Sequence, residues 1–224
     1  MIPVAATVGG AVAAAYRPPS SSLTSKVQHF AAGVVFAAVA GELLPEVMAI
    51  HKPTQVAIGF ALGIALMLGV REATANSAAT KGTRSLVITV GIDLLIDGFL
   101  VGIGFAAGST TGALVLVALT LEVLFLGVAT AAAISESGAV RRQIIGIPSG
   151  LAALLVLGAA VGAFALQGLS DAWLEVVLGF GAAALLFLVT EELLVEAHEV
   201  PETPITTAFF FVGFLALLLI EMAA

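Results

Sequence analysis

Long apolar stretches alternate with short polar segments along the whole chain. A helix needs roughly 20 apolar residues to cross the hydrocarbon of a bilayer, and most of the stretches approach that length. The segments between them are rich in Pro, Ser, Thr, Gly and charged residues, which is typical of loops. The pattern predicts an all-α, polytopic membrane protein with about eight transmembrane helices, near residues 2–16, 28–50, 54–70, 86–107, 112–134, 144–167, 172–195 and 205–222.

Composition agrees with this class. Of the 224 residues, 60% are hydrophobic and only 10% are charged, whereas an ordinary soluble domain has about 25% charged residues. The net charge is −7 and no basic cluster is present, so a nucleic-acid partner is excluded and the lipid bilayer is expected instead. The first residues lack a basic leader and are interpreted as a membrane segment. Cysteine is absent, so thiolate chemistry is excluded.

The basic residues predict the orientation of the helices. With eight spans, Lys52 is alone on one side of the membrane, and the other side holds Arg17, Lys26, Arg71, Lys81, Arg84, Arg141 and Arg142. Basic residues concentrate on the cytoplasmic side of membrane proteins. We therefore expect an integral protein of the plasma (inner) membrane with both termini extracytoplasmic.

Two segments resemble each other. GELLPEVMAIH (41–51) in the second span is similar to EELLVEAH (191–198) in the seventh, so that Glu42 corresponds to Glu192 and Glu46 to Glu196. The predicted topology runs these two spans in opposite directions. Inverted repeats that meet near the membrane midplane are typical of transporters.

The fourth and fifth spans carry the acidic residues that need an explanation. Asp93 and Asp97 are four residues apart, which places both on one helix face, and Thr89 lies one turn earlier on that face. Glu122 lies near the middle of the fifth span. Each ionised carboxylate at the bilayer centre costs about 2.5–3.5 kcal/mol, and no Lys or Arg is expected within the spans. A cation site formed by Asp93, Asp97 and Glu122 explains all three, although protonated carboxyls that join neighbouring helices are the structural alternative.

Other polar residues are candidates for the ends of a transport path. Glu42 lies deep enough in the second span to be a fourth ligand, and Glu46 lies one turn beyond it, where it faces water or the path. Pro45 would free a backbone carbonyl one turn earlier. The cytoplasmic end of the seventh span is crowded with Glu191, Glu192, Glu196, His198 and Glu199, which either attract an exiting cation or form a solvated helix end. Of these, Glu192, Glu196 and His198 are the further pathway candidates. The two remaining histidines, His29 and His51, are expected at helix ends in the interface.

Several other functions can be weighed against metal transport. The motifs HExxH, GxGD and GxSG are absent, so the chain is not expected to be a membrane protease or another enzyme. A proton- or sodium-coupled carrier of a small organic solute is the stronger alternative. That function needs a larger polar cavity, and the spans contain few Ser, Thr, Asn, Gln or aromatic residues to line one.

The chain resembles the ZIP (Zrt/Irt-like) divalent metal transporters over nearly its whole length, through HFAAGVVFAAVAGELLPE, DGFLVGIGF and LLFLVTEELLVEAHE. That family carries His-Asn-x-Pro-Glu/Asp-Gly in its fourth helix and His-Glu-x-Pro-Glu-Gly in its fifth. Aligned on Gly98, Asp97 takes the acidic place and Asp93 the histidine place. Aligned on Gly127, Glu122 takes the histidine place of the second motif.

The resemblance implies a single transmembrane domain over 1–224. It would consist of inverted three-helix repeats, about 1–70 and 144–224, around a central helix pair at about 86–134. It also implies a possible homodimer and a transported divalent metal (Zn, Mn, Fe or Cd) with no resident cofactor.

The departures from the family motifs bear on the metal. Where the family has Asn, Glu and Glu, this chain has Leu94, Val123 and Leu126, and Ile96 and Phe125 replace the two prolines. A divergent member with one site of carboxylates, and without imidazole ligands, is therefore expected. Oxygen ligands favour hard ions such as Mn²⁺ over Zn²⁺.

Overall fold

A computed structural model of the chain describes residues 2–17, 20–49, 51–78, 83–165 and 170–223. Within these ranges every regular element is a helix, and seven helices are long and apolar enough to cross a membrane. The predicted class of all-α, polytopic membrane protein is confirmed. The elements are α1 (Ile2–Tyr16), α2 (Ser21–Ala38), η1 (Val39–Leu43), α3 (Leu44–Ala49), α4 (Pro53–Ala78), α5 (Thr83–Ala107), α6 (Ser109–Glu136), α7 (Arg141–Ala165), α8 (Asp171–Phe187), η2 (Leu188–Leu193), α9 (Leu194–Ala197) and α10 (Pro204–Ala223).

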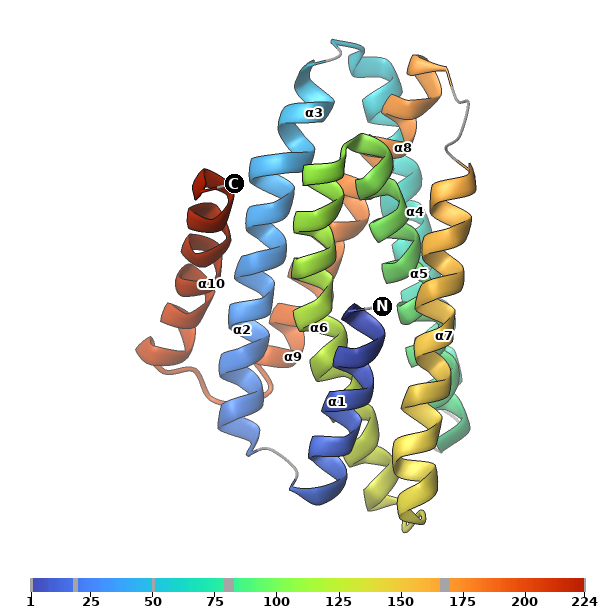
Figure 1. The fold of residues 1–224 in the computed structure, drawn as a ribbon, viewed down its shortest axis with the longest axis vertical. Coiled ribbons are helices and arrows are strands. Elements are labelled where there is room, and N and C mark those ends of the chain that lie inside the picture. The colour runs from blue at the N-terminus through green and yellow to red at the C-terminus, as the bar shows by residue number, and fades with distance from the viewer. Residues whose placement is uncertain (1, 18–19, 50, 79–82, 166–169, 224) are drawn as a thin grey trace.

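The helices run alternately down and up through one bundle (Figure 1). We call the end where α1, α6 and α9 finish the lower end, and the opposite end the upper end. Lys52, between α3 and α4, belongs to the upper end, whereas Lys81 lies outside the described residues. Elements at the lower end carry the other described basic residues, which are Arg17, Lys26, Arg71, Arg84, Arg141 and Arg142.

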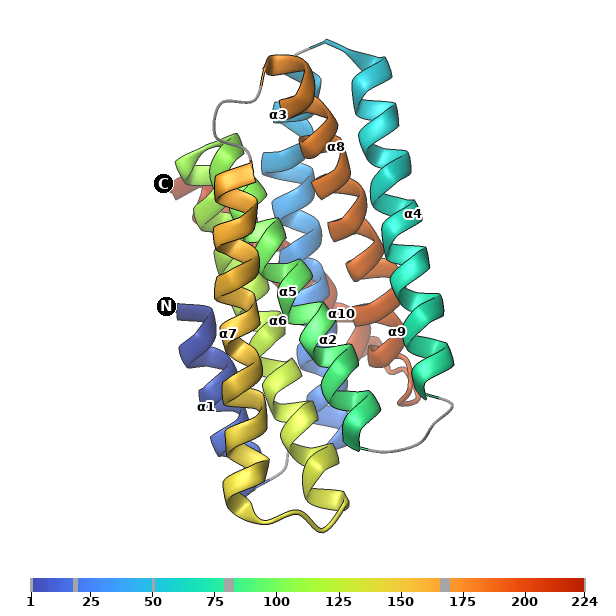
Figure 2. The ribbon, with the colours of Figure 1, turned by 90° about the vertical axis from the view of Figure 1, so that its right-hand side faces the viewer.

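Two continuous rods form the middle of the bundle, α2–η1–α3 and α8–η2–α9, and they run in opposite directions (Figure 2). Helix α10 packs against α2, and α4 packs against α8. Helices α5 and α6 contact each other, α7 lies against α5, and α1 lies against α6. The largest buried cluster joins both rods to α5 and α6 through side chains such as Leu43, Leu185, Leu100 and Leu119.

Close backbone contacts recur in the two halves of the chain. A Cβ atom on Gly63 of α4 would overlap the carbonyl oxygen of Phe180 of α8, and one on Gly213 of α10 would overlap that of Phe30 of α2. The pairs occupy corresponding positions in the repeated segments, because Phe30 precedes Glu42 by the same distance as Phe180 precedes Glu192. Small residues let helices approach closely in lipid. The outer helices α4 and α10 thus pack in the same way against two rods that run in opposite directions.

Replacing Gly213 by Ala should destabilise the bundle, because the new methyl group has no room beside the Phe30 carbonyl. Overpacking of this kind costs about 1–3 kcal/mol. Gly69 is the matched control, since nothing lies within 4 Å of a Cβ atom there. Thermal unfolding in detergent should show a lower midpoint for Gly213→Ala and an unchanged or higher one for Gly69→Ala. Equal midpoints would contradict the packing described here.

Each rod contains one π turn, which the hydrophobic pattern did not predict. The amide of Leu44 donates to the carbonyl of Val39, and the amide of Leu194 donates to that of Val189, at corresponding positions of the repeat. Pro45 follows the first turn, but Val195 takes its place in the second, so proline alone does not cause the wider turn. Such turns are frequent at functional sites.

Two helix boundaries differ clearly from the predicted ones. Helix α2 begins at Ser21 rather than near 28, because the Ser20 side chain caps it by accepting from the Leu23 amide. Helix α4 continues to Ala78, since residues 71–78 include good helix formers. His29 therefore lies well inside α2 and is 2% exposed, so its expected position at a helix end is wrong. Arg71 likewise lies on α4 rather than in a loop.

Candidate functional site

A cavity of about 210 Å³ lies among the two rods, α4, α5 and α6. Its walls come from the last turns of α4, the first half of α5, the second half of α6 and the end of the α8–η2–α9 rod. All four of these segments belong to the lower part of the bundle (Figure 2), so the cavity lies toward the lower end. Its polar lining consists of Gln28, Arg71, Thr89, Asp93, Glu122, Glu191, Glu192 and Glu196.

Helix α5 contributes a ladder of three polar side chains. Thr89 and Asp93 line the cavity itself. Asp97 lies one turn deeper, 1% exposed, beside a small pocket that it shares with Asp93, Glu192 and Met67. Thr89, Asp93 and Asp97 therefore lie on one face of α5, as expected.

Glu122 on α6 is the second deeply buried acid. It is 6% exposed, and it lies within electrostatic range of Asp97, Asp93 and Glu192. One carboxylate oxygen of Glu122 and one of Asp97 have no hydrogen-bond partner. Burying an ionised carboxylate without a partner is costly, so these oxygens are suited to a cation or a proton.

The π turn η2 and helix α9 bring further acids to the same cavity. Glu192 interacts electrostatically with Asp93 and Glu196. Gln28 of α2 donates a hydrogen bond of 2.5 Å to Glu196 and so joins the two rods. The pathway candidates Glu192 and Glu196 therefore lie beside Asp93, Asp97 and Glu122.

Arg71 forms an ion pair with Glu191 at the mouth of the cavity. Both side chains are partly exposed there, unlike Asp97 and Glu122 deeper inside. No basic residue was expected within a span, but α4 extends far enough to carry Arg71 onto the cavity wall. Its charge offsets the acids at the mouth, and Asp97 and Glu122 lie beyond it.

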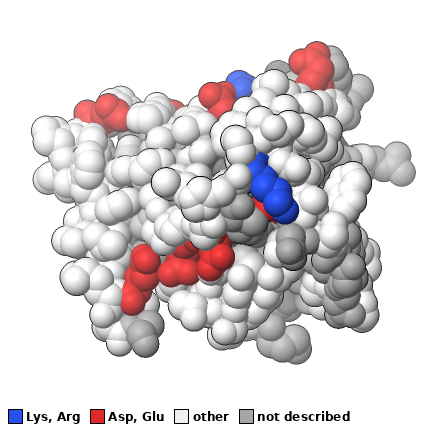
Figure 3. Space-filling model, turned by 90° about the horizontal axis from the view of Figure 1, so that it is seen from above, with Lys and Arg blue, Asp and Glu red and all other residues white. Residues whose placement is uncertain are grey.

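Glu42 lies at a different place, in the upper part of the α2–η1–α3 rod. Its carboxylate accepts a 2.9 Å hydrogen bond from Thr111 of α6 and interacts with Glu221 of α10. Glu46 is half-buried one turn further on, in α3. Seen from above, most of the surface carries no charge, and the acidic atoms form several separate groups, one of which is a continuous patch (Figure 3). The structure thus separates Glu42 from the three central acids that were expected to be its fellow ligands.

His198 lies outside the cavity, directly after α9, where it meets His29 and Glu202. These three residues are the one group within the described ranges whose potential ligand atoms, from three His, Asp or Glu residues, all lie within 4.8 Å of one another. The oxygens of the cavity acids are more widely spaced. The cavity acids therefore do not form a compact ligand set in this structure.

Gln28 and Arg71 line the cavity but were not predicted as site residues from the sequence. Gln28 lies just before an apolar, glycine-containing stretch, and it could have been found only if the start of α2 had been recognised. Arg71 was counted as a loop residue because hydropathy falls sharply after Val70.

Comparisons with known proteins do not identify the chain, because no protein-family model matches it and a search of curated proteins finds no match. Its function must therefore be inferred from its own side chains and their arrangement in the membrane-spanning bundle.

Proposed function

We propose that this protein carries a divalent metal cation across the membrane through the carboxylate-lined cavity. The observation that carries the proposal is the pair of buried acids Asp97 and Glu122, each with a carboxylate oxygen that has no hydrogen-bond partner. A cation between them would offset the cost of burying their charges. Asp93 and Glu192 lie close enough to take part.

The ligand chemistry favours hard cations. The groups that surround the cavity are carboxylates, with Thr89 and Gln28 as neutral oxygen donors, and the three histidines lie elsewhere. Mn²⁺, Mg²⁺ and Ca²⁺ prefer such oxygen ligands, whereas imidazole and thiolate suit Zn²⁺ well. A bound cation would draw the carboxylates inward, since their like charges otherwise keep them apart.

Orientation follows from the basic residues at the lower end. By the positive-inside rule we expect this end to be cytoplasmic and both termini to be extracytoplasmic, which places the cavity on the cytoplasmic side of the bundle. Above it, buried side chains of both rods and of α5 and α6, among them Leu43, Leu100 and Leu185, separate it from the upper end. Inverted repeats around such a site support alternating access, with Glu42 and Glu221 at the opposite mouth.

The resemblance to the ZIP transporters supports the same proposal. Asp93, Asp97 and Glu122 take motif positions of that family, and they are the acids beside the cavity. Helices α5 and α6, which carry them, contact each other between the two repeats. We propose a divergent member of the family in which carboxylates replace the ligand histidines.

Transport of an organic solute is less well supported by the cavity. Sites for drug-sized molecules usually measure about 300–1,000 Å³, and this cavity measures about 210 Å³. Its lining contains five acids, and a neutral solute would leave most of them without partners. A small divalent ion fits both the volume and the charge.

Uptake by proteoliposomes tests the proposed function. Purified protein in liposomes that contain a metal-sensitive dye should take up at least one of Mn²⁺, Fe²⁺, Zn²⁺ or Cd²⁺ faster than protein-free liposomes. A proton or sodium gradient should not drive uptake of amino acids or sugars. Solute uptake without any metal flux would favour the alternative carrier.

The orientation can be tested with single cysteines, because the chain has none of its own. Ser137 and Ser170 are both exposed, the first after α6 at the lower end and the second before α8 at the upper end. In intact cells, an impermeant thiol reagent should label Ser170→Cys and leave Ser137→Cys unlabelled until the membrane is opened. The reverse pattern would invert the topology, and labelling of both would contradict the bundle.

A further inference from the structure

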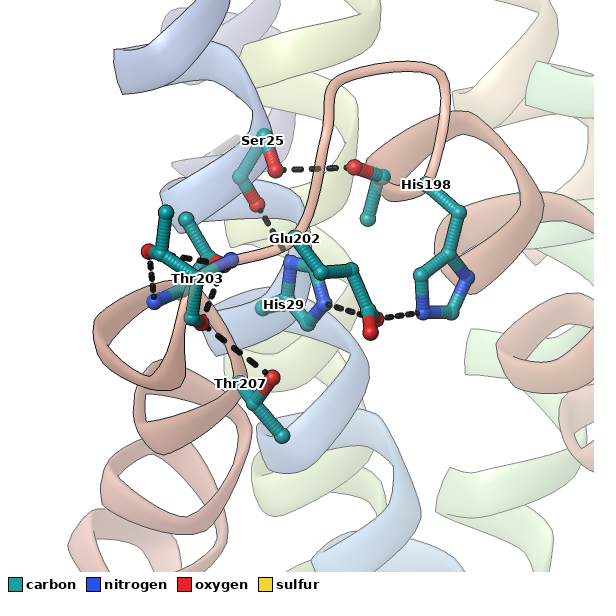
Figure 4. A network of polar contacts seen from close by, with 8 residues as sticks. Ser25, His29, His198, Glu202, Thr203 and Thr207 are labelled. Carbon is teal, nitrogen blue, oxygen red and sulfur yellow. Dashed lines mark hydrogen bonds and ion pairs between the residues drawn. The ribbon is translucent and has the colours of Figure 1, made fainter.

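We propose that His29, His198 and Glu202 form a second metal site, outside the cavity at the lower end, that takes a divalent cation of borderline softness such as Zn²⁺. The site needs no transport activity, so it is independent of the function proposed above. His29 comes from α2, His198 follows α9, and Glu202 directly precedes the cap of α10. Segments far apart in the chain thus meet at one point (Figure 4).

The state of His29 is the first indication of a ligand. This side chain is 2% exposed, and its Nε2 atom is buried with no hydrogen-bond partner. The other ring nitrogen, Nδ1, lies 2.9 Å from the carbonyl oxygen of Ser25 and donates to it in the neutral tautomer. The neutral ring then presents an unprotonated Nε2. Histidines that bind metals usually donate from the second nitrogen in this way.

The other two side chains converge on the same atom. Glu202 Oε1 lies 3.8 Å from His29 Nε2 and is paired with His198 Nε2. In Figure 4 the two imidazoles stand on either side of the Glu202 carboxylate and point toward it. Their rings are nearly perpendicular, with centroids 5.3 Å apart. Two nitrogens and one oxygen therefore surround a common space.

The spacing suits a small ion after a modest adjustment. All three ligand atoms lie within 4.8 Å of one another, and neighbouring ligands of a tetrahedral Zn²⁺ are about 3.4 Å apart, given bonds of about 2.1 Å. His198 and Glu202 are about half exposed and can close this gap, while His29 is held by its surroundings. Two imidazoles and one carboxylate are a common ligand set for Zn²⁺, with water in the fourth position.

The surrounding hydrogen bonds hold the ligands in place. Ser25 Oγ donates to the carbonyl oxygen of Ala197, next to His198, at 2.8 Å. Thr203 and Thr206 form a capping box at the start of α10, since each side chain accepts from the backbone amide of the other. This cap fixes the backbone beside Glu202. A bound ion would link α2, α9 and α10 at the cytoplasmic end.

The test uses tag-free protein in which the three central acids of the proposed transport site are neutralised by Asp93→Asn, Asp97→Asn and Glu122→Gln. This protein should still bind one Zn²⁺ per chain in a calorimetric titration. It should also bind Co²⁺ with the visible absorption of a four-coordinate nitrogen and oxygen site. Adding His198→Gln should weaken binding by more than about tenfold, because ligands matter at least as much as their supporting groups. His51 is an exposed histidine at the upper end, so adding His51→Gln instead should leave Zn²⁺ binding unchanged.

Two results would overturn the second site, namely no Zn²⁺ binding by the cavity variant, or equal binding with and without His198→Gln. His198 is partly exposed, so its replacement should leave the fold intact, and an unchanged elution profile and melting temperature verify this. Zn²⁺ binding by the cavity variant, together with no metal uptake by the wild-type protein, would support the second site and contradict the proposed transport. The two proposals can therefore fail separately.

Discussion

Replacing Asp97 by Asn, or Glu122 by Gln, is expected to reduce divalent-metal uptake by more than about tenfold while the protein remains folded. Each change keeps the size of the side chain and removes a charged ligand from the deepest part of the cavity. Removing a group that only supports a metal ligand lowers metal affinity by about 10–100-fold. Removing a ligand itself should lower the affinity at least as much. Initial uptake rates in proteoliposomes measure the loss.

The same variants should be at least as stable as the wild-type protein when no metal is present. Neutralising Asp97 or Glu122 removes a buried charge and its repulsion from the neighbouring acids, and a charge at the bilayer centre costs about 2.5–3.5 kcal/mol. Thermal unfolding in a chelator should therefore give equal or higher midpoints. Added metal should then raise the midpoint of the wild-type protein more than that of either variant.

Glu175→Gln is the matched control for these variants. Glu175 is completely buried in α8, but it lies toward the upper end, with Lys52 at 3.4 Å. Its replacement tests whether the loss of any buried carboxylate impairs the protein. Uptake should persist in this variant. If Asp97→Asn and Glu122→Gln both retained wild-type uptake, the cavity would not be the transport site.

Selectivity should shift when imidazoles replace two of the cavity acids. The double variant Asp93→His, Glu122→His is expected to raise uptake of Zn²⁺ relative to Mn²⁺ by roughly tenfold, because nitrogen ligands suit Zn²⁺ and oxygen ligands suit harder ions. The wild-type protein should let Mn²⁺ compete well against Zn²⁺. Competition uptake at constant pH measures both, since protons compete with metals for carboxylates.

The control for this prediction has the same number of carboxylates as the double histidine variant, but its added histidine lies outside the cavity. Glu199→His together with Asp93→Asn removes two acids and adds an imidazole on an exposed position after α9, so it should not favour Zn²⁺. A wild-type protein that strongly prefers Zn²⁺ or Cd²⁺, with a double histidine variant that is no better, would contradict the ligand argument.

The hydrophobic pattern predicts the helices well because spanning a bilayer requires long apolar segments, and such segments are visible in any sequence. Asp93, Asp97 and Glu122 could be chosen for a similar reason, since an acid inside an apolar stretch is costly and therefore informative. The resemblance between 41–51 and 191–198 paired Glu42 with Glu192, and both lie on π turns of antiparallel rods.

Tertiary arrangement was harder to predict. Glu192 meets Asp93 beside one cavity while Glu42 meets Thr111 at the other end, and helical spacing says nothing about which neighbour lies opposite. The π turns depend on small shifts of the backbone hydrogen bonds in each rod, which leave no mark in the hydrophobic pattern. The approach of Glu202 to His29 depends on how the segment between α9 and α10 folds back against α2. Arg71 was misplaced because hydropathy marks the edge of the hydrocarbon and not the end of a helix.

The position of a bound ion tests the central claim most directly. Crystals of the wild-type protein grown with Mn²⁺, and measured on both sides of the manganese absorption edge, reveal the ion by its anomalous scattering. We predict a peak within coordination distance of Asp97 and Glu122, beside Asp93 and Glu192, that disappears in Glu122→Gln. A cavity without such a peak at a Mn²⁺ concentration that supports uptake would contradict the proposal that these buried carboxylates carry the metal.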